Sequence, residues 1–157
     1  MSVHCRILVM KYLKNPFLTK VSKTDTAKIE RLMELTFLLG NRPLRNVKFI
    51  NQVATALRFY FIFQALLNKN EEEIEKRVLY LYGEGASILG YVSAYRDISI
   101  KHFFLAKYGN SAHYFNEARY CVQKSYDLAN LIGDISGRKR AKKLVYMFKF
   151  SSLGKFI

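Results

Sequence analysis

The chain of 157 residues has no tryptophan, two prolines, two cysteines and three histidines. So few prolines leave long stretches open to helix formation, because proline breaks helices. Cys5 and Cys121 lie far apart and match no metal-binding spacing, so we interpret them as reduced thiols of an intracellular, cytoplasmic protein. His4, His102 and His113 form no fixed pair, and no nucleophile motif or phosphate-binding glycine loop occurs. We therefore expect a protein that is not an enzyme and needs no cofactor or metal.

The sequence also lacks a long apolar run. Its most apolar stretch, residues 54–67, has eleven apolar residues among fourteen, and Arg58 interrupts it. A bilayer span needs roughly twenty residues. The first residues carry charges within their short apolar run and are followed by no small-residue cleavage site, so we expect neither a secretory signal nor a transmembrane segment.

Apolar residues at helical spacing predict an all-α fold, a compact bundle of five or more helices with a basic C-terminal segment, in a single domain over 1–157. The predicted helices are 26–39, 43–67, a helix capped by Asn70, and 112–132; 99–107 is a separate apolar segment. Gly83-Glu84-Gly85 indicates a kink, a close crossing or a break. Residues 3–13 fit either a helix or a strand.

Residues at the predicted helix ends suggest how the chain turns. Thr24 or Asp25 suits the start of the 26–39 helix, and Gly40-Asn41 suits a left-handed end. Gly133 is expected to end the 112–132 helix in the same way. Leu57 and Phe61 belong to a continuous apolar stripe within 43–67, which is the predicted central core helix, while Arg58 is placed on its polar face.

Charge is distributed unevenly along the chain. The formal net charge is +14. Residues 1–70 have twelve Lys or Arg and three acids, residues 71–134 have seven and nine, and residues 135–157 have seven and none. Both ends are therefore basic while the middle is slightly acidic. This segregation favours a surface that binds a polyanion, provided that the two ends meet in the fold.

Two basic groups are the best candidates for such a surface. The first contains Arg42, Arg45 and Lys48 with Gln52, on one broad face of the 43–67 helix or next to its start. Cations near the positive end of a helix dipole do not favour stability, which points to a functional role. The second group, in which five cations fall within six residues, comprises Arg138, Lys139, Arg140, Lys142 and Lys143. The apolar residues 144–148 follow it directly, so we expect an ordered element to hold this cluster.

These features favour a nucleic-acid-binding protein that contacts phosphates of RNA or DNA. Aromatic residues beside cations could stack on bases; the candidates are Tyr12, Phe17, Tyr146 and Phe150. The alternative is a protein-interaction or membrane-surface protein that docks on an acidic partner or anionic lipid through its basic, aromatic C-terminal segment. An enzyme that uses Glu84 or a histidine has less support.

The block NRPLRNVKFINQVATAL, residues 41–57, resembles a helix of the small subunits of CRISPR effector complexes. In both, a polar turn leads into an arginine-bearing helix with an apolar stripe. The resemblance implies a compact, basic, all-helical subunit without catalytic residues. Such a subunit would line a groove for a guide or target strand, beside other protein subunits of a ribonucleoprotein with a role in antiviral defence.

Overall fold

The computed structural model describes residues 2–15, 18, 20–43, 47–109 and 111–149. In these ranges the chain forms helices joined by turns and short connections, and no strand. The helices are α1 (Ser2–Lys14), α2 (Lys23–Gly40), α3 (Val47–Leu66), α4 (Glu72–Glu84), α5 (Ile88–Gly109), α6 (Ala112–Leu131) and α7 (Ile135–Lys149). The all-α prediction of five or more helices is confirmed, and residues 3–13 belong to a helix.

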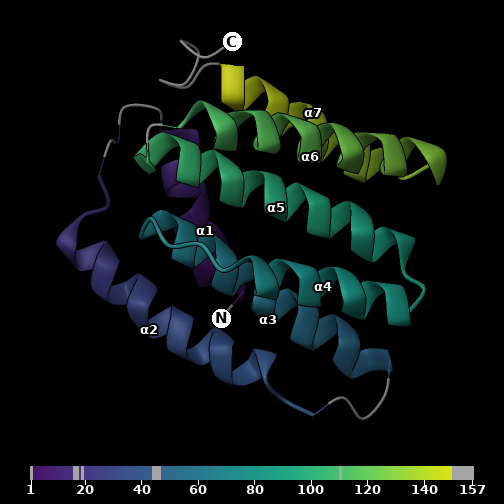
Figure 1. Cartoon of the computed structure of the whole chain (residues 1–157), viewed down its shortest axis with the longest axis horizontal. Helices are drawn as coiled ribbons and strands as arrows, with labels where there is room; N and C mark the ends of the chain where they lie inside the picture. Colours follow the sequence, from purple (N-terminus) through teal and green to yellow (C-terminus); the bar gives the residue numbers. More distant parts are fainter. Residues whose placement is uncertain (1, 16–17, 19, 44–46, 110, 150–157) are drawn as a thin grey trace.

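Helix α5 lies at the centre of the bundle. It packs against α3 and α4 on one side and against α6 and α7 on the other, while α2 packs on α3 (Figure 1). Helix α1 lies behind α3 and α5 and runs across them (Figure 1). Every residue from Ile98 to Ala106 is buried. A helix that is covered all round belongs between two layers, so α5 takes the central position that the sequence had assigned to α3.

The apolar stripe of α3 is confirmed where the structure describes it. Ala54, Leu57, Phe61 and Ala65 are all buried. A Cβ atom added to Gly40, at the end of α2, would overlap the side chain of Leu57. Gly40 therefore permits a close crossing of α2 and α3 rather than the predicted left-handed turn, and the helix ends at Asn41 with a φ of −100°.

The glycines at 83–85 mark a break into two helices. Ala86 has a φ of 49°, in the left-handed region, and the hydroxyl of Ser87 accepts a hydrogen bond of 2.9 Å from the N–H of Gly90. Helix α5 then continues without interruption through 99–107, so the prediction of a separate segment there was wrong. The apolar sequence of 99–107 is that of a buried helix centre.

Several predicted helix ends and inward positions are also corrected. Ser22, not Thr24 or Asp25, caps α2, because its hydroxyl accepts the N–H of Asp25 at 3.1 Å. Glu71 rather than Asn70 precedes α4. Gly133, with a φ of 71°, ends α6 as predicted. Helical spacing places three further apolar residues on inward faces, but they are exposed in the structure: Phe37, Ile88 and Leu131.

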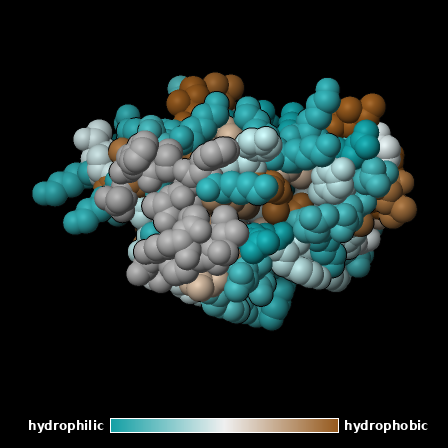
Figure 2. Space-filling model, turned by 90° about the horizontal axis from the view of Figure 1, so that it is seen from above, coloured by the Kyte–Doolittle hydropathy of each residue, from teal (hydrophilic) through white to brown (hydrophobic). Residues whose placement is uncertain are grey.

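Among the described helices, none is both long enough and apolar enough to cross a bilayer. Seen from the α6 and α7 side, most of the surface is hydrophilic, and apolar side chains gather in separate patches (Figure 2).

Asp25 ties α2 to α1. Its carboxylate accepts a hydrogen bond of 2.6 Å from Nζ of Lys11 and another from the hydroxyl of Tyr12. These two donors hold the pKa of Asp25 below its ordinary value. Tyr12 is 1% exposed, so the structure removes it from the candidates for base stacking.

We expect Asp25→Asn to lower the urea midpoint at pH 7, because the variant loses the charge that these donors stabilise. A lowered folded-state pKa contributes stability above the unfolded value of about 4, and this contribution is lost as the pH falls through the folded value. The difference between parent and variant should therefore shrink below pH ~4. Urea titrations from pH 7 to pH 2 measure it, with Glu30→Gln at an exposed position of α2 as the control. A difference that stays constant with pH would contradict the attribution of this stability to the ionised carboxylate of Asp25.

Candidate functional site

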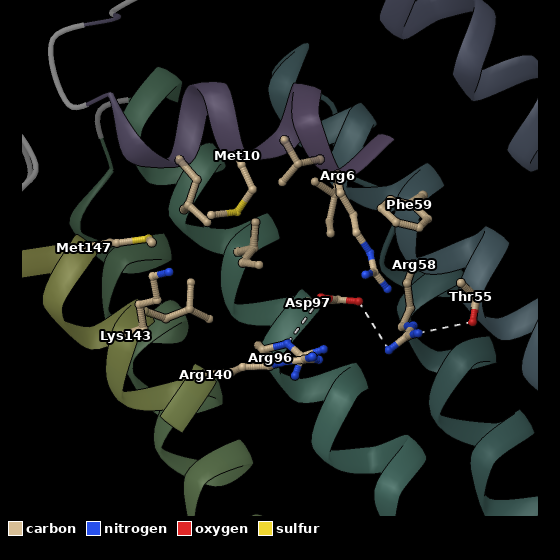
Figure 3. A pocket seen from close by; sticks show the side chains of 15 residues that line it. Arg6, Met10, Thr55, Arg58, Phe59, Arg96, Asp97, Arg140, Lys143 and Met147 are labelled. Carbon is tan, nitrogen blue, oxygen red and sulfur yellow. Dashed lines mark hydrogen bonds and ion pairs between the residues drawn. The ribbon is translucent and has the colours of Figure 1, made fainter. Parts of the chain in front are cut away.

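Basic side chains from both ends of the chain meet around a cavity of ≈ 280 Å³ between α1, α3, α5 and α7 (Figure 3). We call it the arginine cavity. Helix α1 contributes Arg6, Val9, Met10 and Leu13; α3 contributes Thr55, Arg58, Phe59 and Ile62; α5 contributes Arg96, Asp97 and Ile100; α7 contributes Arg140, Lys143, Leu144 and Met147.

Three of these helices use the same local pattern. On α1, α3 and α7 the lining residues fall at positions i, i+3, i+4 and i+7, which places them on one side of a helix. Each set combines at least one cation with apolar residues. The apolar members pack the helices together, while the long cationic side chains extend to the cavity between them.

Among the described residues, Asp97 is the only carboxylate that lines the cavity, against four arginines and one lysine. Its carboxylate oxygens lie 3.4 Å from Nη1 of Arg58 and 4.0 Å from Nε of Arg96. Arg58 also donates a hydrogen bond of 3.2 Å from Nη2 to the hydroxyl of Thr55. The dashed lines in Figure 3 mark these interactions. The described lining residues therefore comprise five cations and one carboxylate, and their net charge is +4.

The two central arginines are largely removed from water. Their side chains are 13% exposed at Arg58 and 16% at Arg96. Within the described part of the chain, Nε of Arg58 is buried without a hydrogen-bond partner. Burial lowers the pKa of Arg96, and the charges of Arg140, Arg58 and Arg6 lower it further, while Asp97 opposes them. An arginine stays charged at any ordinary pH, so a bound anion would relieve this repulsion.

A second cavity of ≈ 300 Å³ adjoins the first. Arg42 and Gln52, both predicted site residues, line it, together with Leu39, Phe49, Asn51, Val53 and Ala56. Thr55 and Phe59 line both cavities. Of the remaining members of the first basic group, Arg45 lies outside the described residues, and Lys48 is in α3 but its side chain is outside the description. The structure thus places part of this group beside the arginine cavity.

The C-terminal basic group lies on an ordered helix, as expected, but its five cations have different surroundings. Arg140 and Lys143 line the arginine cavity. Arg138 donates a hydrogen bond of 3.2 Å to Asn130 of α6, and Nζ of Lys142 lies 5.8 Å from the ring centre of Tyr126 on α6. Lys139 is exposed. Only two of the five cations therefore join the cavity.

The structure adds site residues that sequence reasoning missed. Arg6, Arg96 and Asp97 were not singled out, and Arg58 was assigned to an ordinary polar face. The spacing described above, repeated in three helices, is the signal that could have found Arg6 and Arg58. Arg96 and Asp97 stand in a helix that is buried on every side further along, and only the packing of α5 against its neighbours reveals their partners.

Another group of charged residues lies between α4 and α5. Lys101 is fully buried, and its Nζ donates a hydrogen bond of 2.8 Å to Glu75. Nε2 of His102 lies 3.7 Å from the same carboxylate oxygen. Burial by itself raises the pKa of Glu75, but His102 and Lys101 outweigh it and the pKa is lowered. This group joins α4 to α5.

Other candidates for reactive chemistry are dispersed. His4 and His113 are exposed on different helices. Cys5 and Cys121 are buried, free thiols, and burial raises the pKa of Cys121 to about 12. Among the residues that the structure describes, no three or more His, Cys, Asp or Glu side chains come together in a way that could hold a metal ion.

No protein family model, no curated protein and no solved structure matches this chain. The function is therefore inferred from the geometry and charge of the two cavities.

Proposed function

We propose that this chain is a non-enzymatic nucleic-acid-binding protein that contacts phosphate groups of RNA or single-stranded DNA through the arginine cavity. The observation that carries the proposal is that, among the described residues, four arginines and Lys143 line a cavity whose one carboxylate is Asp97. The guanidinium group presents donors in a fork that matches phosphate oxygens. Cations that are partly shielded from water attract a phosphate more strongly than fully solvated ones do.

The distribution of charge along the chain supports the same proposal. Arg6 comes from the basic N-terminal part, and Arg140 and Lys143 come from the basic C-terminal part. The second cavity adds Arg42 and Gln52 next to them. A strand that follows both cavities would meet cations along several phosphates, with little reading of base edges.

We further propose that the protein is a small subunit of a cytoplasmic nucleoprotein complex, such as a CRISPR effector, as the resemblance of residues 41–57 suggests. Large apolar side chains are exposed where α5 begins, α6 ends and α7 begins (Figure 1): Leu89 is 61% exposed, Leu131 78% and Ile135 57%. Exposed apolar groups that gather at one end of a molecule favour contact with another protein.

The test compares two triple variants of equal charge. Arg6/Arg140/Lys143→Ala removes three exposed cations that line the arginine cavity. Lys139/Lys142/Lys149→Ala removes three exposed cations of α7 that do not line it. We expect the first variant to weaken binding of unrelated single strands alike. Its plot of log affinity against log salt should flatten by about two units, since each lost phosphate contact removes ~0.7.

The control variant should change affinity slightly, and this change should fade above physiological salt as screening increases. Fluorescence anisotropy at several salt concentrations measures both effects, and a thermal melt checks folding. Equal losses in the two variants would mean that the arginine cavity has no special role. If the parent binds anionic vesicles but no nucleic acid, the protein is instead a membrane-surface protein.

A further inference from the structure

The arginine cavity has two chemically different ends. Arg58, Arg96 and Arg140 lie toward one end, whereas Met10 and Met147 lie toward the other, with Lys143 beside Met147 (Figure 3). A site that had to hold only a phosphate would have no need of an apolar end. The arrangement fits a ligand whose anionic group is attached directly to a flat or apolar group.

The charge in the cavity favours a doubly charged anion. After Asp97 is counted, the lining keeps four positive charges. A phosphodiester within a strand carries one negative charge and has two non-bridging oxygens. A phosphomonoester carries about −1.5 to −2 at pH 7 and offers three such oxygens. The monoester neutralises more of the lining and accepts more hydrogen bonds from the guanidinium groups.

The position of the central arginines favours the end of a strand. Arg58 and Arg96 are 13% and 16% exposed, and helices α1, α3, α5 and α7 all contribute to the wall around them. A phosphate in the middle of a strand has chain leaving it on two sides, whereas a terminal phosphate needs only one way in. A volume of ≈ 280 Å³ is at the small end of the range for ligand sites and suits a single terminal nucleotide rather than a length of strand.

We propose that the arginine cavity binds the phosphomonoester at the end of a nucleic acid strand, with the phosphate against Arg58, Arg96 and Arg140 and the terminal base against Met10 and Met147. Thioethers pack well on aromatic rings and adapt to their shape. The second cavity, which shares Phe59, then receives the next part of the strand. This inference rests on the proposed function, because it names the part of the nucleic acid that the same site recognises.

The experiment uses the full chain and three single strands of one sequence, which carry a 5′-phosphate, a 3′-phosphate or hydroxyls at both ends. We expect one of the phosphorylated strands to bind at least about tenfold more tightly than the hydroxyl strand, the equivalent of one additional charged hydrogen bond. The preference should disappear in Arg96→Met and persist in Lys139→Met, which removes an exposed cation of α7 outside the cavity.

The possible results separate this inference from the proposed function. Equal binding of all three strands overturns the strand-end inference and leaves phosphate contact standing. No binding of any strand overturns both. A nucleoside monophosphate should compete for the cavity, and failure to compete with the phosphorylated strand also counts against the inference. Tighter binding to phosphatidic acid vesicles than to the phosphorylated strand would assign the same phosphomonoester chemistry to a lipid headgroup and overturn the proposal for nucleic acid.

Discussion

Glu75→Leu is expected to destabilise the protein by about 3–5 kcal/mol, because it leaves a buried charge without its partner. Lys101 is 0% exposed, and Glu75 is its ion-pair partner at 2.8 Å. Nζ of Lys101 also lies 5.6 Å from the ring centre of Phe61, in the core. The leucine can fill the space of the glutamate but cannot compensate the ammonium group. Urea unfolding followed by circular dichroism measures the loss.

The double variant Glu75→Leu/Lys101→Met should recover most of this stability. A buried ion pair that is replaced by apolar residues of similar volume is often neutral or stabilising, since neither charge then has to leave water. The matched control is Glu73→Leu in the same helix, whose carboxylate is 87% exposed and lies 3.5 Å from Lys76. A surface pair of this kind contributes about 1 kcal/mol or less. A double variant no more stable than Glu75→Leu would mean that Glu75 acts through packing or through His102.

The predictable part of the fold is the part with a clear helical period. The stripe that includes Leu57 and Phe61 is apolar on one side only, and its burial follows from this pattern. Helix α5 could not be placed in the same way, because its buried centre contains Lys101 and His102 as well as apolar residues. The sequence indicated only a separate apolar segment at 99–107, whereas the ion pair of Lys101 with Glu75, 26 positions away, permits the burial of this charge inside a continuous helix.

The candidate site was predictable only in part for a related reason. A run of cations such as 138–143 is visible in any sequence, but its members lie on different sides of α7, and periodicity alone does not say which side meets α1 and α5. Arg140 and Lys143 lie on the side of the cavity, while Arg138 and Lys142 face α6. Isolated cations such as Arg6 and Arg96 give no local signal, because long-range packing alone brings them together.

One substitution in the arginine cavity should change stability and binding in opposite directions. We expect Arg96→Met to raise the stability of the free protein, on the order of 1 kcal/mol, and to weaken its binding to single strands about tenfold. Burial and three neighbouring arginines oppose the charge of Arg96, so an apolar side chain of similar length removes repulsion and leaves Asp97 paired with Arg58. Binding weakens because a phosphate contact is lost.

Lys107→Met provides the contrast. Burial lowers the pKa of Lys107 as well, but its Nζ donates hydrogen bonds of 3.3 Å and 3.0 Å to the backbone oxygens of Tyr12 and Asn15. Its removal should therefore destabilise the protein, since it takes away the donor that holds α1 to the end of α5. Thermal melts measure the stability of both variants, and anisotropy titrations measure their binding to single strands. If Arg96→Met lowers stability as Lys107→Met does, Arg96 is a structural residue. In that case the charge of Arg96 does not destabilise the free protein, and the opposition between stability and anion binding is wrong.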